Sequence, residues 1–224
     1  QDWMYDMLAG IIAEGENYGN LVSDCKEKIQ VEYVSANPTG PLHVGHGRGA
    51  AVGSALANLM KAAGMNVSRE YYINDAGNQI NNLAASVNAR YLEQLGQTVE
   101  FPENGYHGHD IIETAERIVR IYGDRFLDMS EEERLKEFRT IALKEKLAAL
   151  KEDLEAFNVT YDEWFSEQTL HDANAIKNAC DLLTERGYLY EEGGALWLKA
   201  TEYGDDKDRV VIRDNGIPTY FAAD

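Results

Sequence analysis

The most informative segment of the chain is Glu32-Tyr33-Val34-Ser35-Ala36-Asn37-Pro38-Thr39-Gly40-Pro41-Leu42-His43-Val44-Gly45-His46. Residues 29–33 alternate apolar and polar side chains, which is typical of a short strand. Asn37–Pro38 favours extended backbone, because the proline restricts the residue before it. Residues 44–63 then follow a helical pattern that ends at Gly64, a residue type that commonly terminates helices. The stretch is therefore predicted to connect a strand to a helix.

A second strand and a second helix follow directly. Residues 67–73 are predicted to form the strand, and the turn at 74–77 leads into a helix that runs to about Leu95. Strand, helix, strand, helix at this spacing is the rhythm of a parallel α/β fold. Open sheets of this kind bind ligands beyond the carboxyl ends of their strands, which is where the quoted stretch lies.

The flanking segments follow other patterns. Residues 1–22 predict a helix with a glycine-rich end, broken at Gly15 and Gly19. Beyond the core we predict a loop over 96–109 and then a charged and solvated helical region over 110–156. A strand over 159–165 and a helix over 172–186 are predicted to follow. Two hairpins come last, one over 188–199 around Gly193–Gly194 and one that pairs 209–213 with 219–222 around Asn215–Gly216.

Composition and charge limit the function. The chain has 224 residues and a formal charge of −18, yet residues 31–92 carry four basic and three acidic groups. The missing basic footprint argues against tight polynucleotide binding by this piece alone. No apolar run is long enough to span a membrane and no secretory signal is visible, so we expect a cytoplasmic location. Cys25 and Cys180 lie far apart and are expected to be reduced, unpaired thiols.

The start of the first helix carries the chemistry. A helix N-terminus offers unpaired backbone N–H groups and a partial positive charge, which suit a phosphate. His43 and His46, three residues apart, can both donate hydrogen bonds to phosphoryl oxygens in a transition state. A glycine costs about 0.5–1 kcal/mol in a helix relative to alanine. Close approach of a ligand or a neighbouring backbone would explain the four in this helix, Gly45, Gly47, Gly49 and Gly53.

Two simpler interpretations of the histidine pair compete with this one. His-x-x-His on a helix can be half of a metal site, but no third ligand stands at a recognisable spacing, so no metal site is predicted. The pair can also be ordinary surface histidines. Neither the dinucleotide fingerprint nor a phosphate loop with its lysine occurs anywhere in the chain.

These residues carry a family resemblance. His43–His46 resembles the HIGH motif of class I aminoacyl-tRNA synthetases, and residues 31–49 and 69–83 look closely like bacterial arginyl-tRNA synthetases. The resemblance implies an α/β fold with a Rossmann-like parallel nucleotide-binding core, truncated, with a helical and hairpin insertion. It implies four parts: residues 1–28 as a linker from a preceding appended domain, 29–95 as the first half of the core, 96–213 as the insertion with part of the core, and 214–224 as the start of the second half.

The resemblance also implies a reaction. Arginine and ATP, with magnesium accompanying ATP as substrate, would give arginyl-adenylate, and the arginyl group would then move to tRNA. His43 and His46 would be catalytic, and Gly45 and Gly47 would join them in binding ATP. The family's arginine pocket matches Glu32, Asn37, Tyr220 and Asp224. Carboxylate and amide oxygens suit the guanidinium group, which has five donors and no acceptor.

Other assignments are less direct. From spacing alone Tyr220 would be a half-buried strand aromatic and Asp224 a surface acid, and the family match favours function for both. Ser35, Asp75 and Gln79, with the neighbouring Asn78, are predicted to lie near the ligand. The simpler alternative for Asp75 is that it caps the following helix.

The resemblance implies that the chain stops before the site is complete. The second catalytic loop, the adenine-binding strands and the anticodon-binding domain would follow Asp224, so we expect residues 1–224 alone to be inactive and most tRNA contacts to lie elsewhere. The whole protein is expected to be a monomer that does not bind a membrane. A nucleotidylyltransferase with a His-x-Gly-His loop is one alternative, although such enzymes usually lack an insertion like 96–213. A non-catalytic ligand-binding module descended from a synthetase is another.

Overall fold

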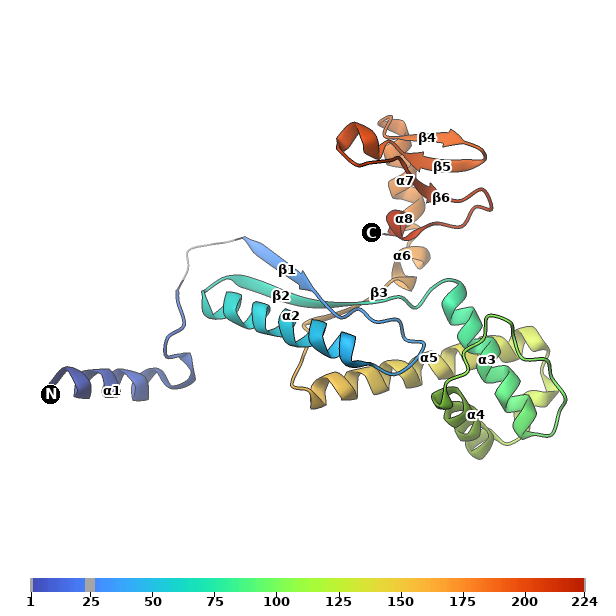
Figure 1. Ribbon diagram of the computed structural model, residues 1–224, viewed down its shortest axis with the longest axis horizontal. Helices are drawn as coiled ribbons and strands as arrows, with labels where there is room; N and C mark the ends of the chain where they lie inside the picture. The colour runs from blue at the N-terminus through green and yellow to red at the C-terminus, as the bar shows by residue number, and fades with distance from the viewer. Residues whose placement is uncertain (1, 23–26, 224) are drawn as a thin grey trace. The chain divides into compact units, whose positions relative to one another are not determined.

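The chain folds into two compact units, one reaching to Phe165 and the other beginning at Ser166. A computed structural model describes residues 2–22 and 27–223 (Figure 1). The first unit contains α1 (Asp2–Glu14), η1 (Gly15–Asn17), β1 (Lys28–Glu32), α2 (Val44–Ala62), β2 (Asn66–Ile73), α3 (Asn78–Gln94), α4 (His109–Tyr122), η2 (Arg125–Asp128), α5 (Glu131–Ala156) and most of β3 (Glu163–Ser166). None of the described helices is long and apolar enough to cross a membrane.

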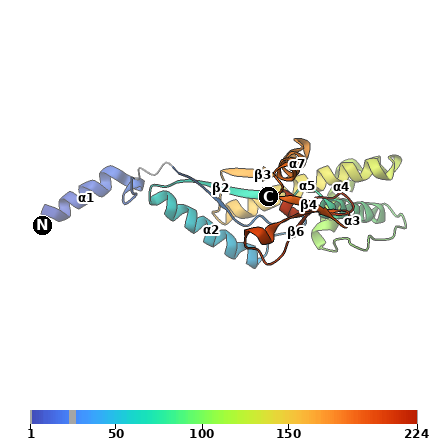
Figure 2. The same cartoon turned by 90° about the horizontal axis from the view of Figure 1, so that it is seen from above.

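The predicted strand–helix–strand unit is confirmed. β1 and β2 pair in parallel, with Ile29 opposite Val67 and Glu32 opposite Glu70, and β3 joins β2 on its other side. α2 is the crossover, and it lies beside β2 in both views (Figure 1, Figure 2). Its small buried residues, Ala50, Gly53 and Ala57, recur at helical spacing and allow the helix to pack closely on the sheet.

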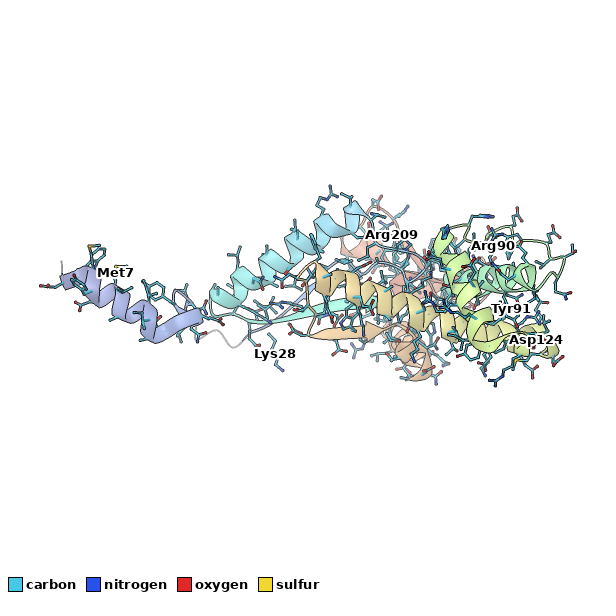
Figure 3. All side chains as sticks on the ribbon, turned by 90° about the horizontal axis from the view of Figure 1, so that it is seen from below. Met7, Lys28, Arg90, Tyr91, Asp124 and Arg209 are labelled. Atoms are coloured by element: carbon cyan, nitrogen blue, oxygen red, sulfur yellow. The ribbon has the colours of Figure 1, made fainter. Side chains whose placement is uncertain are left out.

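The charged helical region predicted after the loop consists of two helices, α4 and α5. Gly123, at a φ of 60°, ends α4, and Ser130 begins α5 with a capping box to Glu133. These helices pack with α3 around an apolar core, and Tyr91 on α3 and Asp124 after α4 lie on neighbouring segments of this bundle (Figure 3). The core consists of Leu83, Val87, Tyr91, Ile111, Ala115, Ile118, Phe126, Phe138 and Ala142.

The exterior of this bundle is charged, as the sequence predicts, with Glu131, Glu132 and Glu133 exposed at the start of α5. Arg134 and Lys146 are exceptions, because both are buried. Arg134 donates through Nε to the Asn88 side-chain oxygen at 2.6 Å, and Lys146 is paired with Asp110.

The second unit is a small helix and hairpin assembly. It contains α6 (Gln168–Asp172), α7 (Ala175–Glu185), β4 (Leu189–Glu192), β5 (Ala195–Leu198), η3 (Ala200–Tyr203), β6 (Arg209–Ile212) and α8 (Tyr220–Ala223). β4, β5 and β6 form an antiparallel sheet, and the hairpin at Gly193–Gly194 is confirmed, with both glycines at positive φ. Cys180 is a free, buried thiol in the core of this unit, and Cys25 lies outside the described residues.

Two local predictions in this unit need correction. The helix predicted over 172–186 is present as α7, but it begins later, at Ala175, because Asn174 adopts a left-handed backbone with a φ of 52°. The hairpin partner predicted over 219–222 is instead the start of α8, and pairing reaches only an isolated bridge between Ile212 and Pro218. Backbone bonds from the Arg213 N–H to the Ile217 carbonyl and from the Thr219 N–H to the Val211 carbonyl flank this bridge, and the chain turns into a helix directly after Thr219.

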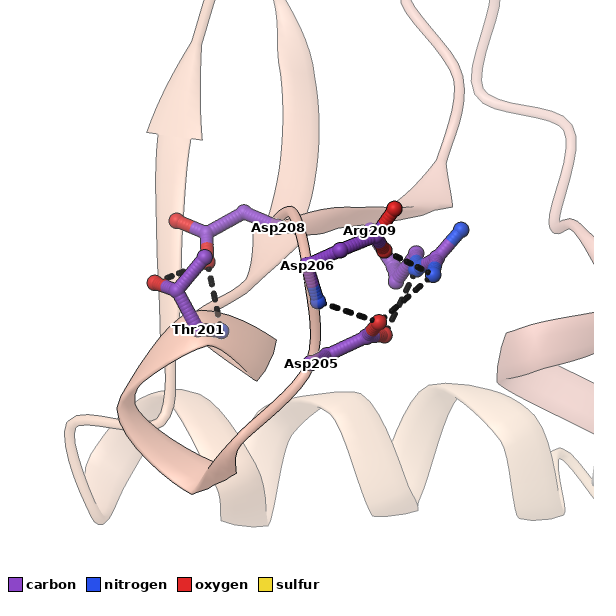
Figure 4. Close-up of polar contacts among 5 residues, drawn as sticks. All are labelled: Thr201, Asp205, Asp206, Asp208 and Arg209. Carbon is purple, nitrogen blue, oxygen red and sulfur yellow. Dashed lines mark hydrogen bonds and ion pairs between the residues drawn. The ribbon is translucent and has the colours of Figure 1, made fainter.

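A compact polar turn leads into β6 (Figure 4). Arg209 donates to both carboxylate oxygens of Asp205 at 2.7 Å and to Asp206 at 2.8 Å. The Arg209 hydrogen bonds hold the pKa of the Asp205 carboxyl well below its usual range. Asp208 accepts from the backbone N–H and the hydroxyl of Thr201 at 3.0 and 2.8 Å. These bonds set the geometry of the turn between η3 and β6.

Candidate active site

Two histidines cap the first crossover helix. His43 is the N-cap residue of α2, with extended backbone, and its Nδ1 accepts from the Gly45 N–H at 3.1 Å. His46 reaches back, and its Nδ1 accepts from the His43 N–H at 3.2 Å. The two rings stack with their centroids 3.7 Å apart. The motif is therefore a capping box built from histidines, in which two backbone donors at the helix start are satisfied.

This arrangement decides which ring nitrogens carry protons. A nitrogen that accepts a hydrogen bond carries no proton, so each neutral imidazole holds its proton on Nε2. Partial burial, and then the neighbouring His43, lower the pKa of His46, which keeps that ring neutral at pH 7. Each ring thus offers an Nε2–H donor beside a helix N-terminus, and an anion such as a phosphate suits that combination.

The glycines of α2 divide into two groups. A Cβ on Gly53 would lie 2.2 Å from the Tyr33 ring, and one on Gly45 would lie 2.9 Å from the His43 ring. Close packing inside the unit therefore explains these two. A Cβ on Gly47 or Gly49 would meet no described atom within 4 Å. The open surface beside the histidine cap is where a ligand would have room.

Replacing Gly53 with alanine should destabilise the first unit by about 1–3 kcal/mol, because the new methyl group would overlap the buried Tyr33 ring. Gly49→Ala is the matched control on the same helix. It adds the same methyl group where there is open space and should stabilise α2 by about 0.5–1 kcal/mol. Urea unfolding of both variants measures the difference, and equal stabilities would contradict this account of Gly53.

The carboxylate nearest the histidines in sequence lies at the end of β1, just before the loop that leads to α2. Glu32 ends β1, and its Oε1 accepts from the Ser35 hydroxyl at 2.7 Å. The same Ser35 oxygen accepts from the Tyr72 N–H of β2 at 3.1 Å. Ser35 therefore connects the Glu32 carboxylate to the neighbouring strand.

Each of the three neighbouring strands β1, β2 and β3 carries one glutamate of a group of three carboxylates. Glu32 and Glu70 are register partners on parallel strands, and Glu163 lies at the start of β3. Burial raises the pKa of Glu70, and Glu32 and Glu163 raise it further. We did not predict Glu70 and Glu163 from the sequence, although the parallel register of the two predicted strands was a signal for Glu70. This concentration of negative charge favours a cation as ligand.

The remaining predicted residues fall into three places. Asn37 is exposed on the same loop as Ser35. Asp75 is buried before α3 while Asn78 and Gln79 are exposed at its start, and the N-cap position belongs to Gly77 rather than Asp75. Tyr220 begins α8 in the second unit and is 71% exposed, so it is not the half-buried strand aromatic that spacing alone suggested. Asp224 lies outside the described residues.

A parallel strand–helix–strand unit whose helix is capped by His-x-Gly-His is the architecture of an HxGH-type nucleotide-binding domain. The family model described as tRNA synthetases class I (R), catalytic domain, matches residues 7–224, and the chain belongs to this family. Its α/β fold is the class I synthetase fold expected from the sequence.

Individual relatives agree with the family match. The chain is 56% identical over 224 residues to an arginine–tRNA ligase of Carboxydothermus hydrogenoformans, covering 100% of this chain and 40% of that protein. It is 53% identical over 222 residues to the arginine–tRNA ligase of Moorella thermoacetica, covering 99% and 40%. The chain thus spans about 40% of the length of these relatives.

Solved structures show the same similarity. A Campylobacter jejuni structure, named provisionally as an arginyl-tRNA synthetase, matches with a TM-score of 0.86 at 35% identity, covering 99% of this chain and 48% of that one. The Thermus thermophilus arginyl-tRNA synthetase matches with a TM-score of 0.63 at 27% identity, covering 91% and 35%.

Proposed function

We propose that this chain is the catalytic part of an arginine–tRNA ligase. In the reaction, the carboxylate of arginine attacks the α-phosphorus of ATP, pyrophosphate leaves, and the arginyl group then passes from the adenylate to the terminal ribose of tRNA. The observation that carries the proposal is the histidine-capped start of α2, which one loop connects to the Glu32 carboxylate at the end of β1. The relatives named arginine–tRNA ligase support the choice of amino acid.

The histidine cap serves the phosphate step. The Nε2–H groups of His43 and His46 would donate to phosphoryl oxygens as negative charge rearranges, while the first N–H groups of α2 add their partial charge. Gly47, which has open space beside it, would let the phosphates approach the helix, and Gly45 would leave room for the His43 ring that binds them. Magnesium would enter with ATP as part of the substrate, and its charge would offset that of the leaving pyrophosphate.

The carboxylates serve recognition of arginine. Glu32 would accept from the guanidinium, in an orientation that Ser35 maintains, and Asn37 would contribute an amide oxygen. Tyr220 and Asp224 complete the proposed set. Asp75 and Gln79 are proposed to lie near the ligand, because they follow the neighbouring strand at the same end of the sheet.

The proposal is tested by charging assays with the full-length protein that contains this chain, across all amino acids. Arginine alone should be attached to tRNA. Glu32→Gln should raise the KM for arginine about 10- to 100-fold, since a hydrogen bond to a charged group contributes about 1.5–3 kcal/mol. Glu163→Gln removes a nearby charge without touching the Ser35 bond and should change this KM much less. Efficient charging of another amino acid would reject the arginyl assignment.

Two alternative functions, a nucleotidylyltransferase and a non-catalytic ligand-binding module, compete with this proposal. Membership of the synthetase family decides against the small nucleotidylyltransferase. A non-catalytic module is tested by the same assays, because it would charge no amino acid. The four-part division of residues 1–224, the monomeric state and the cytoplasmic location remain predictions.

A further inference from the structure

The loop that carries Ser35 has an unfavourable backbone. Val34 and Ser35 have φ values of 70° and 40°, in the left-handed region that residues other than glycine seldom adopt. Val34 is β-branched, so its Cβ substituents make that conformation especially costly. Residues in such regions persist only where the surrounding structure imposes them.

Two tyrosine hydroxyls hold the carbonyls on either side of this strained pair. The Tyr161 hydroxyl donates to the Tyr33 carbonyl at 3.0 Å, and the Tyr71 hydroxyl donates to the Ala36 carbonyl at 2.9 Å. Val34 and Ser35 lie between those two carbonyls. Both ends of the unusual turn are thus attached to side chains from β2 and from the segment before β3.

The tyrosines are themselves held firmly. Tyr71 is fully buried and stacks on Trp164 with ring centroids 4.4 Å apart. Tyr161 meets Tyr71 edge-on at 5.3 Å and packs against Tyr33 at 4.7 Å. Burial raises the pKa of Tyr71 to about 12, and burial also raises the pKa of Tyr161. Both phenols therefore keep their protons and remain donors at neutral pH.

The hydrogen bonds from Tyr161 to the Tyr33 carbonyl and from Tyr71 to the Ala36 carbonyl, here called the tyrosine clamp, affect the orientation of the Glu32 carboxylate. In its present backbone conformation, Ser35 bonds both the Glu32 carboxylate and the Tyr72 N–H. If Val34 and Ser35 relaxed to ordinary φ values, the Ser35 hydroxyl would leave both partners. The Glu32 carboxylate would then lose its fixed orientation.

We propose that Tyr71 and Tyr161 are positioning residues, whose hydroxyls hold the strained Val34–Ser35 turn so that Ser35 presents the Glu32 carboxylate to a cationic substrate. That the cation is the arginine guanidinium rests on the proposed function. The hydroxyls act through the backbone and touch no reacting atom.

The test uses Tyr71→Phe and Tyr161→Phe in the full-length protein, with Tyr91→Phe as the matched control. Tyr91 is also fully buried, and its hydroxyl donates to the Gly123 carbonyl at 2.9 Å, but it lies in the helical core. Each of the first two variants should raise the KM for arginine about 5- to 10-fold, as expected when one hydrogen bond of about 1 kcal/mol is lost. Their kcat and their KM for ATP should change less than about twofold, and Tyr91→Phe should leave all three values unchanged.

Amide hydrogen exchange provides a readout that does not depend on activity. The Ser35 N–H donates to the Tyr33 carbonyl and the Tyr72 N–H donates to Ser35, so both amides should exchange faster in Tyr71→Phe and Tyr161→Phe only. An unchanged exchange rate, or an equal KM effect in Tyr91→Phe, would overturn the positioning role. If the unaltered protein charges no arginine but the Ser35 and Tyr72 amides still exchange faster in both tyrosine variants, the proposed function is rejected. The role of the two tyrosines in holding the Val34–Ser35 turn would still be supported.

Discussion

Replacing His43 or His46 with alanine should slow arginyl-adenylate formation about 10²- to 10³-fold at saturating substrate, while the affinity for arginine changes little. Each imidazole is assigned one donor to the phosphate in the transition state, and loss of one such donor typically costs about 3 kcal/mol. Pyrophosphate exchange and single-turnover adenylate formation in the full-length protein measure the rate, and calorimetry measures arginine binding.

A control is needed because these histidines also cap α2. His43→Ser keeps a side-chain acceptor for the helix start and should recover about 1 kcal/mol of stability relative to His43→Ala, but none of the lost rate. A normal rate at saturation with collapsed arginine binding would contradict the assigned roles. Stoichiometric zinc that disappeared with the same substitutions would support the metal-site alternative instead.

Replacing Lys146 with methionine should destabilise the first unit by about 3–5 kcal/mol. Its Nζ lies 2.6 Å from the Asp110 carboxylate, and the two side chains are 7% and 23% exposed. Nζ also donates to the Asp110 carbonyl at 3.1 Å, which ties α5 to the first turn of α4. Removing one partner of a largely buried pair leaves an uncompensated charge, and this accounts for the size of the effect.

Lys177→Met is the matched control, because Lys177 and Asp181 form an exposed pair whose side chains are 72% and 58% accessible. Its effect should stay below about 1 kcal/mol. Urea unfolding of both variants provides the comparison, and the double variant with Asp110→Asn should recover part of the loss. Equal effects of the two lysine variants would show that burial of the Lys146 pair does not matter.

Local patterns were enough to predict the elements of the core. The alternation over 29–33, the small-residue helix from Val44 and the stop at Gly64 correspond to β1, α2 and a glycine at a φ of 81°. The Gly193–Gly194 hairpin followed from turn chemistry in the same way. The patterns were less informative about where elements begin, because Asn174 delays the start of α7 and the chain enters α8 after Thr219 instead of continuing a strand.

The parallel strand–helix–strand unit and the position of the histidine cap could be predicted from local patterns, because backbone hydrogen bonding and side-chain periodicity are local. The way in which the loop before that cap is held depends on contacts between residues that are distant in sequence. Tyr161 reaches the Tyr33 carbonyl across 128 positions of sequence, and Gly53 makes room for the Tyr33 ring. Such contacts depend on which distant groups are buried against one another, and no spacing along the chain specifies that.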